Sequence, residues 1–123
     1  TRGLDDAIKR MQSFSKLGVD ILFIEAVKNK EDMKRIIKEV PGHHMLNLIE
    51  DGETPLLEIN EIEEIGYKIA VMPLTLMSAS VKTMQECLNN MKNKVYNKNV
   101  SKFSDLRDIV GFNEYYDIED KYK

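Results

Sequence analysis

The sequence predicts an α/β protein, specifically the carboxyl-terminal part of a (β/α)8 barrel of the TIM type with additional C-terminal helices. Three successive segments each combine an amphipathic helix, a glycine and a short apolar strand. The expected strands begin near Val19, His43 and Tyr67, about 24 residues apart, which is typical of a parallel sheet with crossover helices, either doubly wound or closed. Three strands alone would expose unpaired edges, so we favour part of a closed barrel.

The first repeat begins with a helix, because apolar residues from Leu4 to Phe14 recur near a spacing of 3.6. Gly18 follows at a position typical of a helix C-terminus. Residues Val19–Ile24 are almost all apolar, which predicts a strand buried on both faces.

The second and third repeats follow the same order. A helical face over Met33–Val40 ends at a Pro-Gly pair and precedes a strand over His44–Ile49. A helix over Glu58–Ile65 ends at Gly66 and precedes a strand over Tyr67–Met72.

The remaining chain is predicted to be helical, with a long helix over Leu76–Tyr96 and shorter ones over Ser101–Val110 and Asn113–Tyr122. We therefore divide the chain into half a barrel, residues 1–97, and a helical segment, residues 98–123. Many apolar side chains crowd the segment, and a short tail cannot bury them on itself. We expect residues 101–123 to dock on another subunit of a homo-oligomer.

Composition narrows the class of protein. The 123 residues contain 18 Lys and Arg against 21 Asp and Glu, a net charge of -3 that gives no reason to expect nucleic acid as a partner. No apolar run approaches the ~20 residues of a membrane span, and no signal peptide is recognisable. The single Cys87 indicates a reducing compartment, by default the cytoplasm. The chain does not begin with Met, so we expect it to be part of a longer protein.

The candidate site lies where the strands end, because barrel enzymes react at the carboxyl ends of their strands. Glu25 directly follows an apolar strand, where a carboxylate is costly to bury without a role. It either serves function or turns to solvent. Asn47 interrupts an apolar strand and must bond a ligand or a neighbouring loop. The acidic loop 50–55 is better interpreted as a solvated turn than as a cation-binding site.

Other tempting residues are predicted to be structural. His43 and His44 are adjacent on a strand and face opposite ways, so they do not readily share a metal ion. Cys87 falls on the apolar stripe of a helix and is expected in a core. No phosphate loop, zinc spacing or Ser-His-Asp constellation is present in the sequence, and we predict no metal ligands in this chain.

Four ordered motifs make the chain resemble the isocitrate lyase/phosphoenolpyruvate mutase superfamily, in its 2-methylisocitrate lyase and carboxyphosphonoenolpyruvate phosphonomutase-like branch. They are Gly-Leu-Asp-Asp-Ala-Ile (3–8), Leu-Phe-Ile-Glu-Ala (22–26), Asn-Leu-Ile-Glu-Asp-Gly-Glu-Thr-Pro-Leu (47–56) and Met-Pro-Leu-Thr (72–75). The tail Phe-Ser-Asp-Leu-Arg-Asp-Ile-Val-Gly-Phe (103–112) is also similar to that branch, so the resemblance covers essentially the whole chain.

The resemblance implies half of a molecule, since barrels of this family have roughly 250–300 residues. The acids that bind Mg²⁺, a mobile loop with a catalytic cysteine, and a substrate-gripping arginine would all precede Gly3. Cys87 does not match that cysteine. The resemblance also implies a tetramer, a dimer of dimers that exchanges a terminal helix. We expect the segment alone to be inactive.

The resemblance implies functional roles for two residues of this chain. Glu25 matches a catalytic, substrate-site glutamate after the fifth strand, and Asn47, with Leu48 and Ile49 beside it, matches an asparagine that contacts the substrate carboxylate. Ser78 stands where methylisocitrate lyases have a carboxylate-binding arginine. A serine cannot form the bidentate pair of an arginine, which disfavours a tricarboxylate substrate.

The resemblance therefore implies a Mg²⁺-dependent carbon–carbon lyase that cleaves a small 2-hydroxy dicarboxylate through an enolate, like methylisocitrate or dimethylmalate lyases. The alternative within the family is carboxyphosphonoenolpyruvate phosphonomutase. An alternative of another class is a truncated, non-catalytic oligomerisation module.

Overall fold

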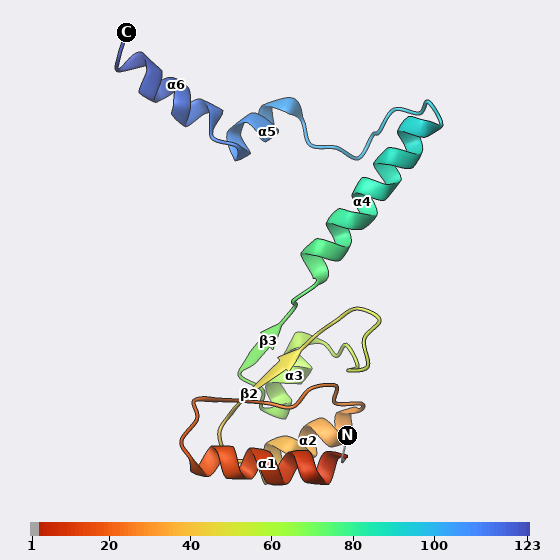
Figure 1. The fold of residues 1–123 in the computed structure, drawn as a ribbon, viewed down its shortest axis with the longest axis vertical. Coiled ribbons are helices and arrows are strands. Elements are labelled where there is room, and N and C mark those ends of the chain that lie inside the picture. Colours follow the sequence, from red (N-terminus) through yellow and green to blue (C-terminus); the bar gives the residue numbers. More distant parts are fainter. Residues whose placement is uncertain (1–2) are drawn as a thin grey trace. The chain divides into compact units, whose positions relative to one another are not determined.

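The computed structural model describes residues 3–123, and the elements alternate between helix and strand as the sequence predicts. The first part contains three βα repeats, with helices and strands in the order α1 Leu4–Lys16, β1 Ile21–Phe23, α2 Lys30–Glu39, β2 His43–Asn47, α3 Ile59–Ile65 and β3 Ile69–Val71 (Figure 1). Three further helices follow, α4 Thr75–Lys92, α5 Phe103–Ile109 and α6 Phe112–Asp120. The predicted element order is confirmed.

The three strands form one parallel sheet in the order β1-β2-β3. Phe23 pairs with Met45, and Asn47 pairs with Val71. Because neighbouring strands are parallel and consecutive, every connection is a helical crossover, which is the unit of a barrel or a doubly wound sheet.

Helices α1, α2 and α3 supply the core on one face of this sheet. Buried residues alternate along β2 and the residue that follows it, so that His44, Leu46 and Leu48 lie inside. They pack with residues of all three helices, among them Ile8, Met33, Ile36 and Ile62. This alternation follows the two-residue period of a strand.

The opposite face of the sheet corrects the prediction of strands buried on both sides. Ile21 is 47% exposed and Ile69 is 37% exposed, and β1 and β3 are three residues long each. Among residues 3–123, both strands lie at edges of the sheet, with no further strand to extend the ladder. The apolar runs predicted as strands are therefore longer than the strands themselves.

Helix ends in the first part of the chain have identifiable local causes, and the predicted stop at Gly66 is one of them. Asn29 caps α2, accepting the Asp32 backbone N–H on its side-chain oxygen at 2.7 Å. Gly66 ends α3 with a φ of 117°, and a Cβ there would approach Ile37 within 2.9 Å. Glycine is therefore required at this position both by the left-handed backbone and by the packing of α2.

The chain divides into two compact units, one up to Val81 and one from Lys82 to Lys123, so the division falls within α4. The long helix ends at Lys92, earlier than the predicted Tyr96, because Lys94 adopts a positive φ of 58°. Cys87 is only partly buried and α4 has no buried residue, so the expectation of a core cysteine is wrong for this chain. The predicted exchange of residues 98–123 between subunits stays a prediction.

No helix among residues 3–123 combines the length and apolar character needed to cross a bilayer.

Candidate functional site

The carboxyl ends of β1 and β2 bring the two main predicted residues together. Paired residues of parallel strands share a face, and the register that pairs Ile21 with His43 places position 25 beside position 47 when it is continued past β1. Both residues lie on the face opposite the helical core, since Leu22 and Leu46 point into that core. Glu25 and Asn47 accordingly line one pocket of about 130 Å³.

The rest of this pocket, which we call the strand-end pocket, comes from Ile49 and from the loops after the two strands. Its lining residues are Glu25, Ala26, Asn47, Ile49, Gly52, Glu53 and Thr54. Residues with two carboxylates, an amide and a hydroxyl therefore line a small space together with the apolar side chain of Ile49. A concave site in which a small number of polar groups converge is typical of small-molecule binding.

Glu25 is exposed in this chain rather than buried, which corrects the expectation drawn from its apolar neighbours. The strand ends at Phe23, and the chain turns at Ala26, whose φ of 56° is unusual for a residue with a side chain. The Glu25 Oε1 atom accepts the Ala26 backbone N–H at 3.1 Å. Strained backbone of this kind concentrates at functional sites.

Asn47 is half-buried at the end of β2. None of the side-chain hydrogen bonds between residues 3 and 123 involves its amide. An amide offers two N–H donors and one acceptor. It is therefore available to a ligand, for which a carboxylate is a suitable acceptor.

The other predicted site residues are not all brought into the strand-end pocket. Ile49 lines it, whereas Leu48 is only 3% exposed and packs in the core on the other face. The Leu48 backbone N–H donates to the Val71 carbonyl at 2.8 Å and continues the sheet. Ser78 is exposed in the first turns of α4 and is not among the described residues that line the pocket. Substrate contact by any of these residues stays a prediction.

Sequence reasoning missed the loop residues that complete the pocket. Thr54 is buried, and Glu53 pairs with Lys28 at 3.5 Å. The acidic loop was expected to be solvated, and no helical or strand periodicity marks its inward-facing members. A signal existed in Asp51-Gly52, a turn pair directly after the strand that carries Asn47.

The two histidines lie on opposite faces of β2, as their adjacent positions predict. His44 is 1% exposed, and its Nε2 atom lies 2.9 Å from the Val40 carbonyl. Its ring meets Tyr67 edge-on, with centroids 6.3 Å apart. His43 is exposed, on the other face of the strand. Within residues 3–123, no group of three or more His, Cys, Asp or Glu could hold a metal ion.

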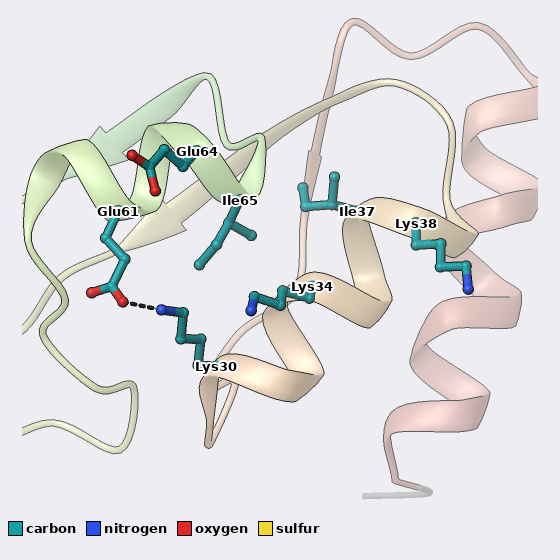
Figure 2. Close-up of a pocket in the computed structure, with 7 residues that line it drawn as sticks. All are labelled: Lys30, Lys34, Ile37, Lys38, Glu61, Glu64 and Ile65. Atoms are coloured by element: carbon teal, nitrogen blue, oxygen red, sulfur yellow. Dashed lines mark hydrogen bonds and ion pairs between the residues drawn. The ribbon is translucent and has the colours of Figure 1, made fainter.

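A larger hollow of about 410 Å³ lies on the helical side, between α2 and α3 (Figure 2). Lys30, Lys34 and Lys38 come from α2, and Glu61 and Glu64 from α3, with Lys30 and Glu61 forming an ion pair. Ile37 and Ile65 are its apolar lining residues. Its charges are mixed and largely balanced, and barrel chemistry occurs at the strand ends, so we take the smaller pocket as the candidate site.

Comparison with known proteins gives the family context of this site. No model of a protein family matches the chain. The chain is 33% identical over 126 residues to 2,3-dimethylmalate lyase of Eubacterium barkeri, covering 99% of the chain and 44% of that protein. It is 30% identical over 124 residues to the chloroplastic carboxyvinyl-carboxyphosphonate phosphorylmutase of Arabidopsis thaliana, covering 98% and 37%. It is 29% identical over 117 residues to 2-methylisocitrate lyase of Aeropyrum pernix, covering 92% and 38%.

Solved structures agree on the fold. The crystal structure of 2,3-dimethylmalate lyase, a PEP mutase/isocitrate lyase superfamily member, matches with a TM-score of 0.82 and 23% identity, covering all of the chain and 44% of that structure. Oxaloacetate acetylhydrolase in complex with the product oxalate matches with a TM-score of 0.85 and 18% identity, covering 99% and 43%. The chain thus has the fold of part of a TIM barrel, as predicted.

The resemblance stated from the sequence is confirmed. The relatives are lyases and mutases of the isocitrate lyase/PEP mutase superfamily, and this chain corresponds to a partial, C-terminal region of them. It spans less than half the length of each relative described above.

Proposed function

We propose that this chain supplies one wall of the active site of a carbon–carbon lyase that acts on a small 2-hydroxy dicarboxylate. The observation that carries the proposal is the convergence of Glu25 and Asn47, from two different strand ends, on one small pocket. The identity to 2,3-dimethylmalate lyase along nearly the whole chain supports the substrate class.

In the proposed reaction, the substrate hydroxyl loses its proton and becomes the carbonyl of a 2-oxo acid. The bond between C2 and C3 breaks, and its electron pair forms the enolate of the second carboxylate, which is then protonated. The Glu25 carboxylate can accept a hydrogen bond from the hydroxyl. The Asn47 amide can donate to a substrate carboxylate and hold it against the apolar wall made by Ile49.

The described residues of this chain do not form a metal site. We propose that the Mg²⁺ implied by the family has its ligands in a preceding part of the protein, where it would stabilise negative charge on the substrate oxygens. The further proposals from the resemblance are a homo-oligomer, formed as a dimer of dimers, and a cytoplasmic location, which suits the single free Cys87.

The test is an assay of the full-length protein that contains this chain. It is incubated with 2,3-dimethylmalate or 2-methylisocitrate, with Mg²⁺ or with EDTA, and the released 2-oxo acid is measured. Cleavage of the dicarboxylate above the tricarboxylate supports the proposal, because Ser78 cannot replace an arginine.

A phosphonomutase is the second candidate, favoured by 30% identity to the plant phosphorylmutase. Rearrangement of a carboxyphosphonoenolpyruvate substrate, followed by phosphorus NMR and without cleavage of either dicarboxylate, would establish it instead. A folded protein that turns over none of these compounds would favour a non-catalytic module.

A further inference from the structure

The loop after β2, residues 50–54, forms part of the wall of the strand-end pocket through Gly52, Glu53 and Thr54. It begins with a tight turn in which the Gly52 N–H donates to the Ile49 carbonyl at 2.9 Å. Asp51 has a positive φ of 58°, and a Cβ at position 52 would lie 2.9 Å from the Ile49 carbonyl oxygen. The backbone of the turn is therefore constrained, whereas the direction in which the loop extends depends on contacts with residues outside the loop.

Glu50, the first residue of this loop, makes such a contact. The Thr75 hydroxyl, on the first residue of α4, donates to the Glu50 Oε1 atom at 2.6 Å. This length is typical of a charge-assisted bond between a hydroxyl and a carboxylate. The helix N-terminus also favours a negative charge at that place. The Thr75 hydroxyl holds the pKa of Glu50 below its usual value, so the acceptor is charged at neutral pH.

A second contact holds the other part of the loop. Glu53 pairs with Lys28, which follows β1, at 3.5 Å, and Thr54 is buried. The loop is thus connected on one side to the segment after β1 and on the other to the helix after β3. Of the two contacts, the one between Glu50 and Thr75 is the shorter, and its length is that of a charge-assisted hydrogen bond.

Neither Glu50 nor Thr75 is among the described residues that line the pocket, so any influence on a ligand passes through the loop. We propose, as an extension of the proposed function, that Glu50 and Thr75 are positioning residues whose hydrogen bond holds loop 50–54 in place as a wall of the carboxylate pocket. They have no chemical role of their own in the reaction.

The test uses the full-length protein and four variants. Thr75→Val removes the hydroxyl with little change in shape, Thr75→Ser keeps it, and Glu50→Gln keeps an acceptor without the charge. Thr83→Val is the matched control, because Thr83 is an exposed threonine of the same helix, about two turns further on. Hydrogen exchange of the peptide over residues 49–54 is measured by mass spectrometry, and KM and kcat are measured for 2,3-dimethylmalate.

We expect Thr75→Val to increase the exchange rate of the loop at least fivefold and KM at least fivefold, with kcat within twofold of the original. For Glu50→Gln, the exchange rate and KM should lie between those of Thr75→Val and those of the unchanged protein. For Thr75→Ser and Thr83→Val, both values should match those of the unchanged protein. Unchanged loop exchange in Thr75→Val overturns the proposal, and so does faster exchange with an unchanged KM. If the unchanged protein cleaves no substrate, the proposed function fails, and loop exchange alone then decides whether the bond positions the loop.

Discussion

A substitution at Glu25 should change turnover while leaving the stability of the protein almost unchanged. Its side chain is exposed, and its hydrogen bond is to the backbone N–H of its own neighbour, Ala26. Glu25→Gln keeps an oxygen that can accept this bond. Exposed substitutions away from special features change stability by less than about 0.5 kcal/mol, so the melting temperature should hardly move.

Turnover should respond quite differently to the same change. If the charged carboxylate contacts the substrate hydroxyl, its loss should reduce turnover at least tenfold, which corresponds to about 1.4 kcal/mol in the activation free energy. The assay is release of a 2-oxo acid by the full-length protein, with thermal unfolding measured on the same preparation. Glu63→Gln is the control, because Glu63 is an exposed glutamate on α3, away from the strand-end pocket.

A second variant tests whether the pocket acts as a unit. Asn47→Ala should raise KM, and the double variant with Glu25→Gln should lose less than the sum of the two single effects, because both residues line the same pocket.

Turnover by Glu25→Gln at the original rate, together with a lowered melting temperature, would assign Glu25 to structure and refute the reasoning.

Three further predictions concern the rest of the chain. The isolated 123-residue polypeptide should have no lyase activity, because its described residues form no metal site; turnover by this segment alone that is abolished by EDTA would contradict this. Burial raises the pKa of Tyr67 to about 12, and its buried hydroxyl has no partner among the described residues, so Tyr67→Phe should be neutral or stabilising at pH 7. The pKa of Tyr67 is higher in the folded protein than in the unfolded chain, so the original protein should lose stability as pH rises from about 10 to 12. Tyr67→Phe should lessen this loss. An equal loss in both proteins would show that burial of Tyr67 is not its cause. Deletion of residues 101–123, whose apolar side chains include Phe103 at 77% and Ile109 at 75% exposure, should yield monomers or aggregates in light scattering, and an unchanged tetramer would refute the exchange of this segment.

The sequence by itself determined the order of elements, the core faces of the helices in the first part of the chain, and the positions of the glycines that end them. These features depend on local chemistry. Met33 and Ile36 are three residues apart and so share one helical face, and the glycine at position 66 ends a helix; both effects act within a few residues of chain. It also predicted Glu25 and Asn47 as partners in one site, since parallel strands end at the same edge.

Tertiary structure decided where burial begins and ends. The apolar run around Ile21 does not reveal that one face lacks a covering neighbour, because cover comes from residues distant in sequence. For the same reason Glu25 turned out exposed, Cys87 only partly buried, and Leu48 directed into the core. The bond from Thr75 to Glu50 joins residues 25 positions apart, and only the folded sheet brings the loop after β2 and the start of α4 together.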